Sequence, residues 1–135
     1  MHNFERLTTW QDAQDLAVDI YKAFADNRDF GLRDQIQRAA VSISNNIAEG
    51  SEYDSDNAFI RYLNIAKGSC SEVRSMLRLC HRINYLDPTT AENYIEKSKK
   101  LSSKITNFIT QLEQNNENCL KSKSLKVKSS KSQIV

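Results

Sequence analysis

The chain has 135 residues, of which 39% are hydrophobic, and a formal net charge of +2, which together describe one domain large enough to bury a core. No apolar run approaches the length of a membrane span, so we expect no membrane partner. Three glycines and one proline are too few for a turn-rich β protein, and helices are therefore favoured from the outset.

Two amphipathic helices are predicted in the first part of the chain. The first runs from about Thr9 to Asp26, and its apolar residues recur at three- and four-residue spacing: Trp10, Ala13, Leu16, Ala17, Ile20, Tyr21 and Phe24. The second runs from about Leu32 to Glu52 on a stripe of Leu32, Ile36, Ala39, Ala40, Ile43 and Ile47. Near its end, Gly50 is either a left-handed cap or a position of close packing, and the sequence leaves both open.

Two more helices are predicted after the turn at residues 53–56. The third reaches about Asn84 on a long stripe made of Phe59, Tyr62, Leu63, Ala66, Cys70, Val73, Met76, Leu77, Cys80 and Ile83. Asp87 and Pro88 begin the fourth as its N-cap and its first residue, and its apolar pattern ends near Gln114. We expect an all-α fold, an antiparallel up-down-up-down four-helix bundle.

The end of the chain differs in composition from the bundle. All seventeen acidic residues lie at or before Glu117, and five of the nineteen basic residues follow it, so the chain to residue 117 carries −3 and the rest +5. Lysine and serine alternate there with few apolar residues, and such a segment cannot recover its ordering entropy by burial. We expect a four-helix-bundle domain at residues 1–116 and a disordered Lys/Ser-rich tail at residues 117–135.

The cysteines and the start of the chain indicate a cytoplasmic protein. Cys70 and Cys80 lie on one predicted helix about 15 Å apart, which is too far for a disulfide. With Cys119 they make an odd, scattered set that suits a reducing compartment, and we expect Cys70 and Cys80 to be core residues. The first residues lack the apolar stretch of a secretory signal.

Residues of catalytic or metal-binding type do not cluster in the sequence. His2 and His81 have no cysteine or carboxylate at ligand spacing, and no Glu-x-x-His pair of a di-metal bundle occurs. Gly31, Gly50 and Gly68 are isolated, so no phosphate-binding glycine loop is present. We expect no catalytic residue, no metal, no cofactor and no small-molecule substrate.

Two short polar stretches interrupt the second and third helices. Ser42, Asn46 and Glu49 share one face of the second helix, and on the third helix Ser69 and Glu72 share another. Gly68 would let a neighbouring backbone approach closely. One interpretation is a polar groove that binds a ligand. The other, which we favour, is a hydrogen-bonded contact within the bundle or at a subunit interface, where polar residues fix register and oligomer state.

Basic residues follow one face of the third helix. Lys67, Arg74, Arg78 and Arg82 are spaced by seven, four and four, so all four point the same way. Arg33 and Arg38 add charge on the second helix, and a second stripe on the fourth helix consists of Lys97, Lys100 and Lys104. These faces are either solvated bundle surface or a phosphate-binding surface. No aromatic residue is interleaved with the charges, so base stacking is not indicated.

The motifs resemble those of the bacterial four-helix-bundle family of 23S rRNA intervening-sequence proteins. The resemblance covers nearly all of residues 4–112, and its matching positions are Trp10, Ala13 and Leu16, then Arg38, Ala39, Ala40, Ser42, Ile43, Asn46, Ile47, Ala48, Glu49 and Gly50, then Ala66, Gly68, Ser69 and Glu72. Ser44 stands where the family usually has proline, which predicts a less kinked second helix.

This resemblance implies a cytoplasmic, non-enzymatic bundle. Related proteins assemble as homopentamers, and the accessory subunit of diversity-generating retroelements shares the architecture and looks like a basic barrel that serves a reverse transcriptase and its RNA. The implied partners are further copies of the chain, here a homopentamer, together with RNA or a nucleic-acid-processing protein.

Three functions compete on this sequence. The first is a homo-oligomeric module that binds RNA, or nucleic acid generally, through Lys67, Arg74, Arg78, Arg82 and Arg38. The second is a protein scaffold or accessory subunit that binds no nucleic acid directly. The third, an enzyme, is disfavoured because the sequence offers no catalytic site.

Overall fold

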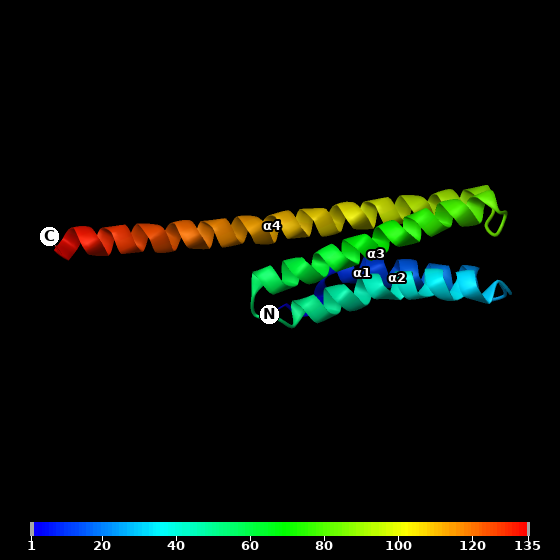
Figure 1. Ribbon diagram of the computed structural model, residues 1–135, viewed down its shortest axis with the longest axis horizontal. Coiled ribbons are helices and arrows are strands. Elements are labelled where there is room, and N and C mark those ends of the chain that lie inside the picture. Colours follow the sequence, from blue (N-terminus) through cyan, green and yellow to red (C-terminus); the bar gives the residue numbers. More distant parts are fainter. Residues whose placement is uncertain (1, 135) are drawn as a thin grey trace.

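Four α-helices and a short 3-10 helix make up the computed structural model, which describes the backbone of residues 2–134 and the side chains of residues 2–126. In chain order they are η1 (Phe4–Arg6), α1 (Thr8–Ala23), α2 (Phe30–Ser51), α3 (Asp56–Arg82) and α4 (Pro88–Ile134). No strand occurs within residues 2–134, so the predicted all-α class with four helices is confirmed. In Figure 1 each helix runs back along the one before it.

The helices pack unequally around the core. α2 packs along α3, and α3 along α4, whereas α1 packs on α2 and touches α4 over a shorter stretch. The stripes predicted for the first three helices supply fully buried side chains, among them Leu16, Ile20, Ile36, Ile43, Ile47, Leu63 and Leu77. Ile95 and Ile105 of α4 are fully buried with them. Each such side chain stabilises the fold by about 1.5–3 kcal/mol relative to exposure. Burial of these stripes therefore determines which face of each helix points inward.

Two predicted core residues lie at the surface instead. Tyr21 is 47% exposed and Ile83 is 41% exposed, although both continue an apolar stripe in the sequence. Ile83 follows the last residue of α3, and Tyr21 lies on the surface between α1 and α2, one residue after the fully buried Ile20.

Side chains and backbone geometry define the helix ends. The carboxylates of Asp29 and Asp87 accept hydrogen bonds from the backbone N–H of Leu32 at 3.2 Å and of Thr90 at 2.9 Å. The start of α4 at Asp87 and Pro88 thus confirms the prediction from the sequence. α3 ends in a Schellman motif, in which Asn84 has a φ of 62° and the N–H of Tyr85 donates to the carbonyl of Cys80 at 2.9 Å.

Gly50 is a close-packing position and not a left-handed cap. It lies inside α2, and no glycine in the described backbone has a positive φ. A Cβ atom at Gly50 would meet Cβ of Tyr62 at 2.7 Å and Cδ1 of Phe59 at 2.9 Å. The absent side chain lets the start of α3 pack directly against the last turns of α2.

The fourth helix is longer than the sequence predicts. We expected it to end near Gln114, and this is wrong, because α4 continues to Ile134 and extends beyond the bundle (Figure 1). Leu112 is the last buried side chain among residues 2–126, and the Asn116 amide donates a 2.9 Å hydrogen bond to Oδ1 of Asn57 at the start of α3. No glycine or proline follows to break the helix.

Residues 117–126 are exposed throughout. The division of the chain at residue 116 into a bundle and a disordered tail therefore stays a prediction about the chain in solution. Two of the tail lysines, Lys128 and Lys131, lie outside the described side chains.

Candidate binding surfaces

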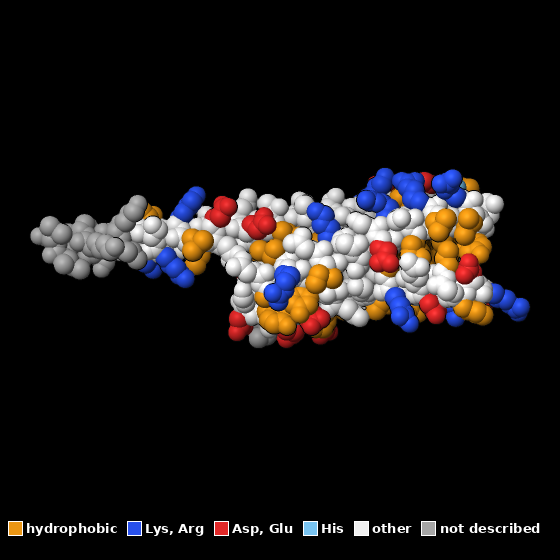
Figure 2. Space-filling model, viewed as in Figure 1, with side chains coloured by type: hydrophobic (Ala, Val, Ile, Leu, Met, Phe, Trp, Pro, Cys, Tyr) orange, Lys and Arg blue, Asp and Glu red, His pale blue; other side chains and the backbone are white. Residues whose placement is uncertain are grey.

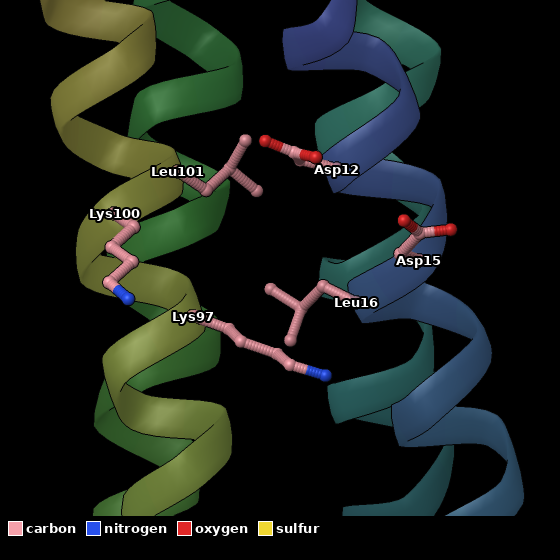
Figure 3. A pocket seen from close by; sticks show the side chains of 6 residues that line it. All are labelled: Asp12, Asp15, Leu16, Lys97, Lys100 and Leu101. Carbon is pink, nitrogen blue, oxygen red and sulfur yellow. The ribbon is translucent and has the colours of Figure 1, made fainter.

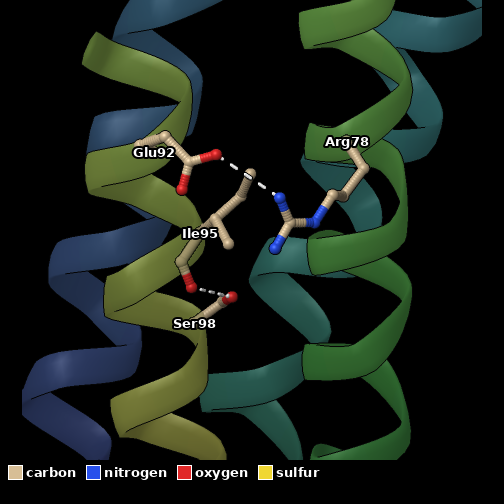
Figure 4. Close-up of polar contacts among 4 residues, drawn as sticks. All are labelled: Arg78, Glu92, Ile95 and Ser98. Atoms are coloured by element: carbon tan, nitrogen blue, oxygen red, sulfur yellow. Dashed lines mark hydrogen bonds and ion pairs between the residues drawn. The ribbon is translucent and has the colours of Figure 1, made fainter. Parts of the chain in front are cut away.

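The basic residues of α3 lie along its border with α4, a surface that we call the α3–α4 edge and define by Lys67, Arg74, Arg78 and Arg82. Arg78 shows the direction of this face, because its Nη1 lies 3.4 Å from Oε1 of Glu92 on α4 (Figure 4). One turn before Arg74, the Cys70 thiol donates to the carbonyl of Ser98 on α4 at 3.1 Å. The four cations are thus displayed along one border of the bundle.

Lys99 belongs with these residues, and the sequence analysis missed it. It follows Glu92 by seven residues, or two helical turns, so it shares the face of α4 from which Glu92 reaches Arg78. The seven-residue spacing between Glu92 and Lys99 is present in the sequence, but it places Lys99 beside α3 only once Glu92 is known to face α3. Figure 2 shows Lys and Arg side chains gathered where the C-terminal part of α3 lies beside the N-terminal part of α4.

Arg38 does not join the α3–α4 edge. It is exposed on α2, one turn before Ser42, and Ser42 bonds to the opposite side of α3. The sequence-predicted set of five cations therefore separates into four along one border and one elsewhere.

The second lysine stripe is largely neutralised by α1. Lys97 Nζ lies 2.6 Å from Oδ2 of Asp19, and Lys104 also forms an ion pair with Asp12. The hydrogen bond with Asp19 raises the pKa of Lys97. Lys100 and Asp15 help to line a cavity of about 230 Å³ between α1 and α4 (Figure 3). Lys97 and Lys104 therefore bridge the border of α1 and α4, and both already have carboxylate partners.

Ser42, Asn46 and Ser69 form one hydrogen-bonded cluster between α2 and α3. The hydroxyls of Ser42 and Ser69 are 2.9 Å apart, and the Asn46 amide donates to the Ser42 hydroxyl at 3.0 Å and to its carbonyl at 2.8 Å. All three side chains are half-buried. Their polar atoms satisfy one another across the two helices, which is the arrangement of a contact within the bundle and not of an open ligand groove.

Glu49 lies at the end of this border and contacts aromatic residues. Its carboxylate accepts a hydrogen bond from the Tyr62 hydroxyl at 3.3 Å, and the Tyr62 and Tyr53 rings stack 5.3 Å apart at 17°. The hydrogen bond with Tyr53 is the largest cause of a raised Tyr62 pKa, followed by partial desolvation and the Glu49 charge.

Gly68 and Glu72 lie apart from the polar cluster. Both are exposed, and no atom beyond the adjoining backbone of α3 lies within 4 Å of a Cβ placed at Gly68. The expected close approach of another helix to Gly68 does not occur inside the chain. A small residue in a helix indicates that another helix could approach closely, but it does not indicate whether that side of the helix faces the core or the outside of the bundle.

Neither thiol in the core is suited to chemistry. Burial raises the pKa of both Cys70 and Cys80 to about 11, so neither is a thiolate near neutral pH. Within the described side chains, no group of three or more His, Cys, Asp and Glu residues is placed to hold a metal ion. No helix of the described chain is both long and apolar enough to cross a membrane.

The chain belongs to the 23S rRNA-intervening sequence protein family, whose model matches residues 5–107. This confirms the resemblance carried by the sequence motifs. A solved structure from Bacteroides thetaiotaomicron, a protein of unknown function from the S23 ribosomal protein family, is 28% identical and superposes with a TM-score of 0.71. The alignment covers 75% of this chain and 97% of that one. No curated protein matches the chain.

Proposed function

We propose that this protein is a non-enzymatic, self-associating bundle that binds RNA through phosphate contacts along the α3–α4 edge. The observation that carries the proposal is the imbalance of charge there. Among the described residues, Glu92 is the one acid that pairs with the four cations of the edge, and it pairs with Arg78 alone. That pair is exposed, so it can yield to a phosphate at little cost.

The spacing of the arginines suits a phosphate backbone. Arg74, Arg78 and Arg82 follow one another at intervals of four residues, or about 6 Å of helix rise. Guanidinium groups bind phosphate oxygens bidentately, and a row of them contacts successive phosphates without reading the bases. Copies of the edge in an oligomer, here a homopentamer as the resemblance implies, would convert weak contacts into useful avidity. The free cysteines suit the cytoplasm as the place of action.

Two variants with equal loss of charge test this proposal. In the first, Arg74, Arg78 and Arg82 are replaced by Gln, and in the second, Lys97, Lys100 and Lys104 are replaced by Gln. Both are made in the full chain after Lys121, Lys123, Lys126, Lys128 and Lys131 have also been changed to Gln, because these lysines would bind any polyanion. Filter binding to a single-stranded RNA measures the affinities, and circular dichroism checks that both variants remain folded.

We expect the arginine variant to lose most of its RNA affinity and the lysine variant to keep it, because Lys97 and Lys104 are already paired with aspartates. Equal losses would show that net charge, and not the α3–α4 edge, determines binding. If the parent protein binds no RNA even at low salt, the proposal is wrong and the scaffold function takes its place.

A further inference from the structure

The exposed side of α3 carries a second row of residues at coiled-coil spacing. This α3 outer stripe consists of Ile65, Gly68, Glu72, Ser75, Leu79 and Ile83, with intervals of three, four, three, four and four. All six are exposed, and the three aliphatic side chains are exposed by 48%, 47% and 41%. Alternating intervals of three and four place residues along one line of a helix, the pattern by which a second helix packs. Figure 2 shows hydrophobic side chains gathered over the C-terminal part of α3.

The small residues of the α3 outer stripe leave room for a partner. Apart from the adjoining backbone of α3, no atom of the described chain lies within 4 Å of a Cβ placed at Gly68, so a helix from outside could approach the backbone there. Ser75 repeats this small position two turns later. The stripe thus has aliphatic residues at its two ends and small residues on either side of Glu72, so a partner helix can approach most closely at its middle.

A second apolar surface lies on the other side of α2. We call it the α1–α2 groove, a depression of about 360 Å³ lined by Gln14, Ala17, Val18, Tyr21, Lys22 and Val41. Val18 is 48% exposed and Tyr21 is 47% exposed. Lys22 at its border forms no ion pair with any acid among residues 2–126. The molecule therefore exposes two different apolar surfaces.

The charge of Glu72 decides how these surfaces can be used. Glu72 occupies the middle of the α3 outer stripe and has no ion-pair partner among the described residues. If two copies paired stripe to stripe in parallel about a two-fold axis, Glu72 would face its own copy, and like charges opposed at a helix contact are unfavourable. The same opposition arises in an antiparallel pair whose axis crosses the stripe at Glu72. The α1–α2 groove instead offers a cation, Lys22, beside apolar residues.

We propose that the α3 outer stripe of one copy packs into the α1–α2 groove of the next, with Glu72 facing Lys22. This inference rests on the proposed self-association and assigns the two surfaces that make it. Because the surfaces differ, the contact is heterologous, and it builds a closed ring or an open filament and not a two-fold dimer. The α3–α4 edge lies on another side of α3, so it stays free to bind RNA.

Two variants, each with one of the two surfaces disrupted, test whether the α3 outer stripe packs into the α1–α2 groove. The stripe variant carries Ile65→Asp and Leu79→Asp, and the groove variant carries Val18→Asp and Tyr21→Asp. All four positions are about half exposed, so the fold should survive, and circular dichroism verifies this. A matched control, Ser103→Asp, adds a charge to the exposed surface of α4. Light scattering after size-exclusion chromatography gives the mass of each protein.

We expect wild type and the Ser103→Asp control to be oligomers and each broken variant to be a monomer. Mixed in equal amounts, the two variants should form a dimer of two 15.5 kDa chains and nothing larger, because one intact stripe and one intact groove remain between them. If either variant stays oligomeric, or if both are monomers and their mixture stays monomeric, the assignment of the two surfaces is wrong, while the proposed self-association still stands. A monomeric wild type overturns the proposed self-association as well.

Exchange of the two charges tests the Glu72–Lys22 contact. Glu72→Lys and Lys22→Glu should each weaken association, and the double variant should recover the wild-type affinity to within about a factor of two, the usual range of additivity error. If the double variant instead shows the summed loss of the two single variants, Glu72 and Lys22 do not meet.

Discussion

Asp87 illustrates how single residues set the limits of the helices. Its carboxylate accepts two hydrogen bonds from Thr90, one from the hydroxyl at 2.6 Å and one from the backbone N–H at 2.9 Å. These bonds, the hydroxyl first, lower the pKa of Asp87 below its usual 3.8. They also satisfy a backbone donor that the first turn of a helix would otherwise leave without a partner.

The lowered pKa of Asp87 predicts a pH-dependent contribution to stability. A group with a depressed pKa in the folded state stabilises the fold fully above its unfolded pKa, and the contribution is lost as the pH falls through the folded value. We expect wild type to melt at a higher temperature than Asp87→Asn at pH 7, since asparagine keeps the cap but not the charge. The difference should vanish in acid, and a difference that does not change with pH would contradict this account.

At the scale of the elements, two helical glycines have opposite surroundings. Gly50 lies against the start of α3, whereas Gly68 faces open space. The sequence presents both as isolated glycines within helical patterns, and nothing in that pattern distinguishes an inward from an outward position.

Replacing Gly50 and Gly68 by alanine should change the free energy of unfolding in opposite directions. Gly50→Ala should destabilise the protein by about 1–3 kcal/mol, because its methyl group collides with Tyr62 and Phe59. Gly68→Ala should stabilise it by up to about 1 kcal/mol, through helix propensity alone. Urea denaturation measures both substitutions in the background of the groove variant, Val18→Asp and Tyr21→Asp, which we expect to be monomeric, because Gly68 also lies in the α3 outer stripe and association itself shifts stability. If both variants move the same way, the packing described around Gly50 is wrong.

The helices were predictable from the sequence, whereas their pairing was not. Stripes such as Ile36, Ile43 and Ile47 reveal an inward face, because burial repeats with the helical period. The neutralisation of Lys97 and Lys104 depends on aspartates of α1 that lie more than seventy residues earlier in the chain. The continuation of α4 beyond Gln114 was missed because the prediction asked only which residues are buried, and a helix satisfies its own backbone without burial.

At the scale of the whole molecule, charge and apolar surface are distributed over different sides of the bundle. The border of α1 and α4 is balanced by ion pairs, the border of α3 and α4 carries excess cations, and the α3 outer stripe and the α1–α2 groove expose apolar residues. In the account we propose, self-association uses the apolar surfaces and repeats the basic edge in each copy.

The salt dependence of RNA binding tests the central claim most directly. The protein with its five tail lysines changed to Gln would be titrated with single-stranded RNA at several salt concentrations. We predict that its affinity falls steeply as salt rises, and that Gln at Arg74, Arg78 and Arg82 flattens the log–log slope by about two, since each phosphate contact to a single strand contributes roughly 0.7. A slope that is the same with and without these arginines would contradict the proposal that the α3–α4 edge binds phosphates.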